Sequence, residues 1–303
     1  MRHFLDLTEW SSLELRHLIQ LAVHLKLEWQ SGGNRPVLAG KTLAMVFQKP
    51  SLRTRVSFDV GMQHLGGHAI MLGPSEIGLG QRESVADVSR VLSSYVQGIM
   101  ARVFAHEHVT EMAAWSSVPV INGLSDARHP CQALTDILTI YEHFGYTDGL
   151  KLAYIGDANN VAASLAMACG HFGIDFTIAS PAGYELPDEM VTVAQECGPG
   201  ITIQKVREPA EAVQDAQIIY TDTWVSMGQE AEAAQRARVF DPYQVNAGLL
   251  AQAPKEAIVM HDLPAYRGKE ITDEVADGPQ SVIFQQAENR LHAQKAILVH
   301  LMS

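Results

Sequence analysis

The sequence predicts an α/β fold made of two open parallel-sheet domains that are joined by interdomain helices. The chain has 303 residues, enough for two domains of roughly 150 residues each. Short apolar runs typical of buried strands alternate with longer helical patterns, and this alternation favours parallel sheets. The alternation restarts at Lys151, just after the turn-forming stretch Tyr146-Thr-Asp-Gly149, so a second domain is expected to begin near residue 148.

The first predicted domain covers residues 1–147. It opens with a helix at 12–30, where apolar residues recur at spacings of three and four and indicate one buried face. The strands expected after it are 41–47, 98–104 and 118–121. The helices expected to follow these strands are one that ends at Gly66-Gly67, one near 107–115 and a long one opened by Pro130.

The second predicted domain covers residues 148–280. Its expected strands are 151–156, 175–179, 201–205, 216–220 and 257–260, with helices at 160–172 and 187–197. The last helix, 281–303, has no strand after it and is expected to pack back on the first domain. Open parallel sheets bind ligands at the carboxyl ends of their strands, so we look for functional residues at those positions.

Composition excludes several classes of function. The formal net charge of −12 disfavours nucleic-acid binding, because such proteins usually carry a broad basic face. The three cysteines, Cys131, Cys169 and Cys197, have no CxxC spacing, which indicates neither a disulfide framework nor a zinc ribbon. The N-terminus lacks the apolar core of a signal peptide, and no apolar run is long enough to span a membrane. We therefore expect a cytoplasmic protein with no membrane or nucleic-acid partner.

A candidate anion site lies where the strand 41–47 leads into the next helix. Ser51, Arg53, Thr54 and Arg55 place two hydroxyl groups, guanidinium groups and unpaired backbone N–H groups at this junction. This combination is typical of a phosphate site, although it lacks the glycines of a Walker A loop. The alternative is a polar helix cap with two solvated arginines.

Three more residues of the first half could act on the same ligand. Arg102 lies inside an otherwise apolar strand, where a guanidinium needs an anion or a structural partner such as Asp126. His129 and Gln132 flank Pro130 at the start of a helix, and their spacing of three places both side chains on one face. Both can donate a hydrogen bond to a carbonyl oxygen; a simple helix cap is the alternative for His129.

The second half offers polar groups after two of its strands. The turn Gly156-Asp-Ala-Asn-Asn160 lacks the second and third glycines of a dinucleotide-binding turn, which disfavours a nicotinamide dehydrogenase. Asn160 instead offers an amide. The stretch Thr221–Gly228 supplies a carboxylate, a hydroxyl group and flexible backbone, with an exposed loop as the alternative.

Four stretches resemble motifs of the aspartate/ornithine carbamoyltransferase family, and specifically of its ornithine branch, and they occur in the same order as the motifs do in that family. They are KPSLRTRVSF (49–58), DARHPCQALTD (126–136), DTWVSMG (222–228) and ENRLHAQKA (288–296). The resemblance covers nearly the whole chain. It implies transfer of the carbamoyl group of carbamoyl phosphate to the side-chain amine of L-ornithine, giving L-citrulline and phosphate. It further implies a homotrimer or a multiple of trimers, with no metal and no organic cofactor.

The resemblance also implies roles for individual residues. The residues that would bind carbamoyl phosphate are Ser51, Leu52, Arg53, Thr54, Arg102, His129, Gln132, Leu263 and Arg290. The residues that would take part in catalysis are Arg102, His129, Gln132, Asp262 and Arg290. The residues that would bind the amino acid are Asn160, Asp222, Ser226 and Met227.

The sequence departs from the family pattern at three positions. Asp262 stands in the stretch His261-Asp-Leu-Pro264 where the ornithine branch usually has a cysteine. Gly78 stands where a glutamine is expected to reach the neighbouring subunit, and Gln81 is a possible substitute. Tyr266 replaces a common histidine.

Asp262 leaves three interpretations open. It could contact the acceptor amine in an ordinary ornithine reaction. It could select another amine, such as lysine, a shorter diamino acid or a substituted ornithine. It could also mark a non-catalytic homologue that only binds carbamoyl phosphate. A purely structural or interaction protein is disfavoured, because it has no reason to place these cationic groups at strand ends: Arg53, Arg55, Arg102 and His129.

Overall fold

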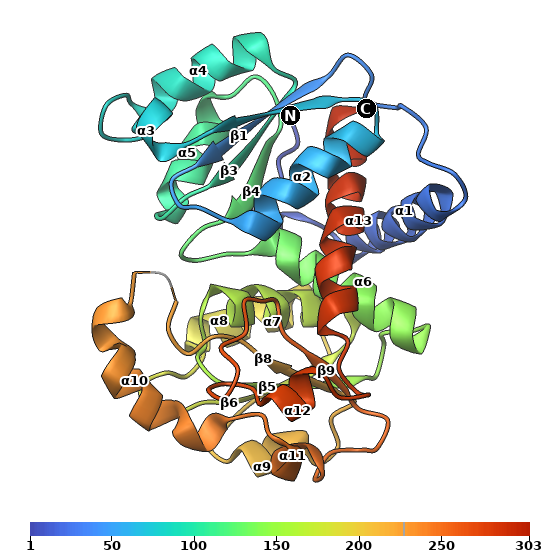
Figure 1. The fold of residues 1–303 in the computed structure, drawn as a ribbon, viewed down its shortest axis with the longest axis vertical. Helices are drawn as coiled ribbons and strands as arrows, with labels where there is room; N and C mark the ends of the chain where they lie inside the picture. Colours follow the sequence, from blue (N-terminus) through green and yellow to red (C-terminus); the bar gives the residue numbers. More distant parts are fainter. Residues whose placement is uncertain (227) are drawn as a thin grey trace. The chain divides into compact units, whose positions relative to one another are not determined.

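The protein, described here from a computed structural model of residues 1–226 and 228–303, divides into two compact units (Figure 1). Unit 1 consists of Met1–Leu138 and Glu288–Ser303, and unit 2 of Thr139–Ala287. The division falls inside two helices, α6 (Pro130–Phe144) and α13 (Ile283–Met302), so each of these helices contributes residues to both units.

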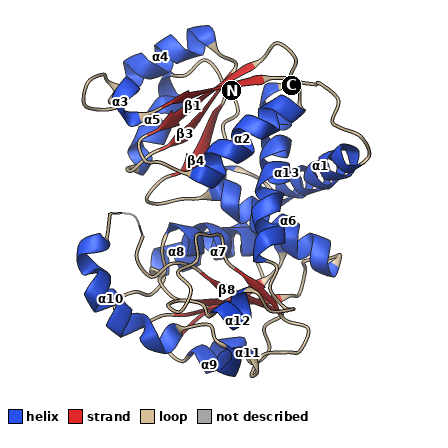
Figure 2. Cartoon of the chain, viewed as in Figure 1, coloured by secondary structure: helices blue, strands red, loops and turns tan. Residues whose placement is uncertain are grey.

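Unit 1 is built on a four-stranded sheet in which every pair of neighbouring strands is parallel (Figure 2). Its strands, in spatial order, are β2 (His68–Leu72), β1 (Thr42–Phe47), β3 (Gly98–Arg102) and β4 (Val120–Leu124). The register places Val46 opposite both Leu72 and Ala101. The two central strands, β1 and β3, are almost entirely buried, which explains their continuous apolar sequences.

Helices cover the sheet of unit 1. They are α1 (Ser12–Gln30), α2 (Leu52–His64), α3 (Pro74–Ile77), α4 (Val85–Tyr95) and α5 (His106–Trp115). One face forms a core in which Val88 of α4 and Met112 of α5 pack with Val46 and Ala101 of the sheet. Figure 1 shows α2 on the opposite side of the strands.

Unit 2 contains a five-stranded sheet, again with parallel neighbours throughout. The strands, in spatial order, are β7 (Ile203–Val206), β6 (Asp175–Ala179), β5 (Lys151–Ile155), β8 (Ile218–Thr221) and β9 (Ile258–Met260). Tyr154 and Tyr220 are paired in register on β5 and β8, and their rings stack with centroids 5.5 Å apart. Burial of this central pair ties the two strands together.

Both faces of this second sheet are covered (Figure 2). The helices of unit 2 are α7 (Asn160–Phe172), α8 (Asp188–Cys197), α9 (Pro209–Val213), α10 (Ala233–Phe240), α11 (Ala247–Leu250) and α12 (Asp273–Ala276). Every residue of α7 from Val161 to Phe172 is buried, as the long apolar stretch requires. No helix in the described part of the chain combines the length and apolar character that crossing a membrane requires.

The predicted fold class is confirmed: both units are open parallel α/β sheets. The predicted strands and long helices all occur, with ends shifted by a few residues; the strand expected at 98–104, for example, ends at Arg102. Strand β2 was not predicted, because it lies at the sheet edge and its five residues are only partly buried. Such a strand lacks the apolar pattern that marks a central strand.

Strand order reverses once in each sheet, and this fixes where a ligand is expected. In unit 1 the chain moves outward from β1 in one direction through β2 and in the other through β3 and β4. In unit 2 the reversal lies between β5 and β8. Open α/β sheets bind ligands outside the carboxyl ends of the strands at such a switch point, where the connecting loops diverge.

Unit 2 also contains a close helix contact that requires glycine. Gly170 of α7 lies against α8, and a Cβ atom added to it would come within 2.3 Å of the carbonyl oxygen of Ala194. Gly198 lies in the same contact, since its Cβ would meet the Gly170 carbonyl oxygen at 1.9 Å. The backbones of the two segments therefore touch without side chains between them.

We expect Gly170→Ala to lower the free energy of unfolding by about 1–3 kcal/mol, because backbone must shift to admit the methyl group. Gly61→Ala is the matched control: Gly61 also lies within a helix, but its added Cβ would meet its nearest atom, in the Lys295 side chain, at an ordinary 3.4 Å. That control should be neutral or slightly stabilising. Urea denaturation measures both, and equal effects would contradict the close contact.

Candidate functional site

The start of α2 forms the base of the site in unit 1. Ser51 is the N-cap residue, and its hydroxyl oxygen accepts the backbone N–H of Thr54 at 3.3 Å. The remaining N–H groups of the first turn point out of the helix end and favour a negative charge there. Leu52, in the first turn, has an exposed side chain, whereas Arg53 is half-buried and Arg55 is exposed.

Thr54 connects two buried arginines from distant parts of the chain. Its hydroxyl oxygen lies 2.9 Å from Nη2 of Arg290, on α13, and 3.5 Å from Nη1 of Arg102, at the end of β3. Both arginines are at most 7% exposed. We call Arg102, Arg290, Thr54, His129 and Gln132 the cationic cluster.

Gln132 completes the cluster from the first turn of α6. Its Oε1 accepts a hydrogen bond from Nη1 of Arg290, and its Nε2 donates to the buried Asp136 carboxylate at 2.8 Å. The two bonds fix which end of the amide faces Arg290. His129, one residue before α6, is also buried.

The charge balance of unit 1 at this position favours an anionic ligand. Lys49, which the sequence had not singled out, is buried close to the cluster with its ammonium 5.1 Å from the centre of the Phe104 ring. Burial, and then the charge of Arg102, lowers the pKa of Lys49 to about 8. Positive groups out of water are costly unless an anion compensates them, and a phosphate dianion provides that charge.

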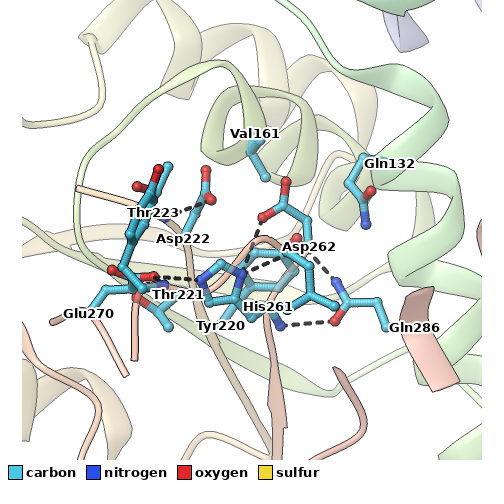
Figure 3. A network of polar contacts seen from close by, with 12 residues as sticks. Gln132, Val161, Tyr220, Thr221, Asp222, Thr223, His261, Asp262, Glu270 and Gln286 are labelled. Carbon is cyan, nitrogen blue, oxygen red and sulfur yellow. Dashed lines mark hydrogen bonds and ion pairs between the residues drawn. The ribbon is translucent and has the colours of Figure 1, made fainter. Parts of the chain in front are cut away.

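In unit 2 the polar groups after β8 and β9 are acidic (Figure 3). Asp222 follows β8 and is buried; its Oδ2 accepts from Nδ2 of Asn159 at 2.7 Å and its Oδ1 from the backbone N–H of Thr223 at 2.6 Å. Burial, and next the charge of Asp262, raises the pKa of Asp222 well above its usual value. Both effects disfavour the ionised carboxylate.

His261 and Glu270 lie behind this carboxyl pair. Nε2 of His261 lies 3.1 Å from Oε1 of Glu270, and the backbone N–H of His261 donates to Gln286 at 2.9 Å. Asp262, whose side chain is 12% exposed, has its Oδ1 3.5 Å from Nδ1 of the same ring. Figure 3 shows Asp222, Asp262 and Glu270 grouped around His261, and we call these four residues the acidic array.

The protonation of His261 is subject to opposing influences. Burial lowers its pKa, but hydrogen bonds with Asp262 and Glu270, together with the charges of Asp262 and Asp222, outweigh burial and raise the pKa to about 9. The backbone N–H of Leu263, however, donates to Nδ1 at 2.9 Å, which requires an unprotonated nitrogen there. The contact therefore belongs to the neutral ring, whose single proton lies on Nε2 and faces Glu270. Below its folded pKa the ring takes up a second proton at Nδ1, which lies 3.5 Å from Oδ1 of Asp262.

The backbone at Leu263 has an unusual conformation. Its φ of 61° lies in the left-handed region, which costs a residue with a Cβ roughly 1–2 kcal/mol. The bond from its N–H to Nδ1 of His261 holds this conformation in place. Uncommon backbone conformations of this kind concentrate at functional sites, since the surrounding structure must maintain them.

Asn159 and Arg236 position the surrounding loops, and sequence reasoning missed both. Asn159, rather than its neighbour Asn160, caps α7 and reaches Asp222; an asparagine directly before a helix was the available signal. Arg236 of α10 binds the buried Asp157 carboxylate at 2.7 Å and the carbonyl oxygen of Trp224 at 3.0 Å. It therefore ties the loop after β8 to the turn after β5.

The other predicted residues of unit 2 lie in the same region of the chain. Asn160 is the first residue of α7 and is half-buried, and Ser226 is half-buried in the loop after β8. The backbone N–H of Ser226 donates to Gln229 at 3.0 Å. Met227 lies outside the described residues.

Metal binding by the acidic array is disfavoured by its hydrogen bonds. Ligand atoms of Asp222, His261 and Asp262 all lie within 4.8 Å of one another, close enough to surround a small cation. The Nδ1 lone pair of His261, however, is occupied by the N–H of Leu263, and Nε2 faces Glu270. The imidazole thus offers no lone pair to a metal in this arrangement.

Gly78, at the position where the resemblance predicts a glutamine, has a backbone conformation that favours glycine. Gly78 ends α3 with a φ of 58°, and an added Cβ would lie 2.8 Å from Cβ of Arg82. Glutamine at this position would therefore require another loop conformation. Gln81, the suggested substitute, has an exposed side chain.

Comparison with known proteins identifies the family. Residues 2–142 match the carbamoyl-P binding domain of aspartate/ornithine carbamoyltransferases, and residues 148–301 match their Asp/Orn binding domain. The chain belongs to the aspartate/ornithine carbamoyltransferase family. It is 52% identical over 303 residues to the ornithine carbamoyltransferase of Anoxybacillus flavithermus, an alignment that covers 99% of this chain and 96% of that protein.

Solved structures extend this similarity to the fold. The ornithine carbamoyltransferase of Pyrococcus furiosus is 48% identical and superposes with a TM-score of 0.97 over 99% of this chain and 97% of its own. The Thermus thermophilus enzyme is 42% identical, with a TM-score of 0.90 over 99% and 98% of the two chains. These relatives place the chain in the ornithine branch of the family.

The acidic array makes stability depend on pH. The pKa of His261, about 9 in the folded protein, exceeds its unfolded value of 6.5, so the folded chain holds an extra proton between these values. This contribution is complete below pH 6.5 and is lost as the pH rises through about 9. We expect the free energy of unfolding to decline by an order of 2–3 kcal/mol over this window.

Glu270→Gln should make this decline shallower, because it removes the carboxylate whose hydrogen bond with the ring raises the pKa of His261. Urea denaturation at a series of pH values between 6.5 and 9.5 measures the change. Glu288→Gln is the control, since the Glu288 side chain is 55% exposed and belongs to α13, outside the acidic array. An identical pH dependence for Glu270→Gln and the unaltered protein would refute the role of the array.

Proposed function

We propose that this protein is an ornithine carbamoyltransferase: it transfers the carbamoyl group of carbamoyl phosphate to the side-chain amine of L-ornithine and releases L-citrulline and phosphate. The proposal is carried by similarity over the full chain to enzymes of that name. It is supported by the charges at the two places where strand order reverses, between β1 and β3 and between β5 and β8. Unit 1 presents cationic groups and unit 2 presents acidic groups, which suit a phosphate and an ammonium respectively.

Carbamoyl phosphate is assigned to the first domain, residues 1–147 with the returning helix. In this proposal the phosphate binds at the start of α2, where the helix N–H groups, Ser51, Thr54 and Arg53 are available. Leu52 contributes its backbone N–H, since its side chain is apolar and exposed. Arg102 and Arg290 neutralise the leaving phosphate, which therefore departs without a metal ion.

Polarisation of the carbamoyl carbonyl is assigned to His129, Gln132 and Arg102. As the amine attacks the carbamoyl carbon, negative charge develops on the carbonyl oxygen. Donors held in a buried site before the reaction stabilise that charge, an effect worth roughly 3–4 kcal/mol for one well-placed donor. The bonds that Gln132 makes to Arg290 and Asp136 keep such a donor set rigid.

The amino acid is assigned to the second domain, residues 148–280. Asn160, Asp222, Ser226 and the backbone of Met227 are proposed to hold its α-amino and α-carboxylate groups, with Leu263 near the carbamoyl group. Asp262 is proposed to contact the side-chain amine. Two buried carboxyl groups repel an acceptor with an acidic side chain, which favours ornithine over aspartate.

The family relationship also motivates an assembly and a location. We infer a homotrimer, or a multiple of trimers, that works in the cytoplasm in amino-acid biosynthesis. The anabolic ornithine carbamoyltransferase of Pyrococcus furiosus is 48% identical to this chain over 303 residues, which supports the biosynthetic direction. Light scattering of the purified protein tests the assembly.

A change of acceptor is the second candidate, and Asp262 is the observation that favours it. A carboxylate in place of a thiol changes where an ammonium group binds best. This suits a longer, shorter or substituted diamino acid whose amine lies at another distance from the α-carbon than that of ornithine. The test is a comparison of kcat/KM for L-ornithine, L-lysine, a shorter diamino acid and an N-substituted ornithine with carbamoyl phosphate. L-Ornithine is expected to give the highest kcat/KM. A higher kcat/KM with another amine would identify that amine as the preferred acceptor. No turnover with any amine would favour a non-catalytic homologue.

We expect Arg290→Gln to lower kcat/KM by a factor of about 10²–10³, because it removes a buried cation from the proposed phosphate site. It should also abolish the rise in melting temperature that inorganic phosphate gives the unaltered protein. Arg90→Gln is the matched control, since Arg90 is 52% exposed and pairs with Asp87 on the surface of unit 1. If both variants bind phosphate and turn over alike, Arg290 has no part in the site.

A further inference from the structure

His129 follows directly on a short loop of unit 1, residues 125–128, which connects β4 to α6. The loop closes on itself, because the backbone N–H of Ser125 donates to the carbonyl oxygen of Arg128 at 2.9 Å and the N–H of Arg128 donates to the Ser125 hydroxyl at 3.2 Å. His129 is buried, and its carbonyl oxygen accepts the N–H of Ala133 in α6 at 3.2 Å. The place of its ring therefore depends on how this loop is held.

The first half of the loop is attached to the segment between β3 and α5. The backbone N–H of Asp126 donates to the carbonyl oxygen of Phe104 at 2.8 Å, and the backbone N–H of His106 donates to the Asp126 carboxylate at 2.9 Å. The ring nitrogen Nδ1 of His106 lies 2.8 Å from the hydroxyl oxygen of Ser125. Residues 125 and 126 are thus fixed from one side.

The second half of the loop is bound from a segment 122 positions earlier in the sequence. Nε of Arg128 donates to Oδ2 of Asp6 at 2.6 Å, and the two side chains are 18% and 14% exposed. The segment that carries Asp6 runs along β4: the N–H of Phe4 donates to Val120 at 2.8 Å, and the carbonyl oxygen of Phe4 accepts the N–H of Asn122 at 2.8 Å. Asp6 therefore reaches the loop from a backbone that the sheet itself fixes.

We propose that the ion pair of Asp6 and Arg128 positions the imidazole ring of His129, so that both residues contribute to turnover without touching a substrate. The inference rests on the proposed function, in which His129 donates to the carbamoyl oxygen, and it adds two positioning residues that act through this ring. No covalent bond forms or breaks at the pair itself.

The chemistry and the partial burial of the pair suit this role. A bond between a guanidinium and a carboxylate is charge-assisted and directional, so it restrains where Arg128 and the adjoining backbone lie. Partial burial reduces the screening that makes exposed ion pairs weak. A donor stabilises a developing oxyanion only at hydrogen-bond distance, and a displacement of about 1 Å can lower the rate on the order of 10²-fold. Loosening the loop therefore acts on the transition state more than on ligand binding.

The test is steady-state kinetics of Asp6→Asn, Arg128→Gln and the double variant with carbamoyl phosphate and L-ornithine. We expect each single variant to lower kcat about tenfold, while the KM for either substrate changes by less than about twofold. The rise in melting temperature given by inorganic phosphate should persist, because the start of α2 and Arg290 are unaltered. A merely structural role would instead lower the melting temperature and leave the kcat of the folded enzyme unchanged.

The double variant tests whether the two residues act as one unit. Its kcat should match that of the single variants within about twofold, because the second substitution removes an interaction that is already lost. Asp87→Asn, Arg90→Gln and their combination are the matched controls, since this ion pair lies in unit 1 on α4 and its side chains are 67% and 52% exposed. All three controls should keep the kcat of the unaltered protein.

Arg128→Lys keeps the charge but not the planar guanidinium, and it serves as well if a charge-removing variant fails to fold. Its kcat should lie below that of the unaltered protein and above that of Arg128→Gln, at an unchanged KM. Full kcat in these variants, or losses that multiply in the double variant, would overturn the inference while turnover by the unaltered protein upholds the proposed function. Absence of turnover by the unaltered protein with any amine would instead overturn the proposed function.

Discussion

Like charges held away from water are the constraint on which both parts of the candidate site depend. In unit 1, Arg102 and Arg290 converge on Thr54 in a buried position. In unit 2, Asp222 and Asp262 converge beside His261. Neither arrangement is favourable alone, because the Coulomb repulsion is poorly screened in a protein interior. In the proposed function, a phosphate compensates the first arrangement and an ammonium group the second, so each position disfavours a ligand of the wrong charge.

The parallel sheet makes this concentration of charge possible. Its strands are buried and apolar along their length, so polar residues are confined to the loops at strand ends. Where the strand order reverses, the two neighbouring loops run in opposite directions across the sheet. Their polar residues are therefore not covered by a connecting helix at that point. Ser51 and Asn159 occupy equivalent positions as N-caps of the helices that follow β1 and β5, and each fixes the direction in which its helix leaves the sheet.

The sequence was informative wherever the pattern was local. Central strands could be predicted because their apolar runs are continuous, and long helices because apolar residues recur at spacings of three and four. Strand β2 could not, since an edge strand is only partly buried and carries a weak pattern. The short helices α10 and α12 were also missed, because fewer than three helical turns give too few repeats to recognise.

Residues that act through long-range contacts were equally hard to find. Glu270 matters because it reaches His261, and Asn159 because it reaches Asp222, 63 positions away in sequence. No periodicity records such a pairing. Asp262 and Arg290, by contrast, could be singled out because each lies within a recognisable motif. The roles of both remain predictions that depend on the experiments described above.

The left-handed conformation at Leu263 has a consequence for how such an enzyme can diverge. Two backbone N–H groups fix the shape of the segment from His261 to Pro264: that of His261 donates to the Gln286 side chain, and that of Leu263 donates to the His261 ring. The side chain at 262 takes no part in either bond. Residue 262 can therefore be changed without removing the bonds that shape this loop, so the chemistry presented at this position is separable from the fold that supports it.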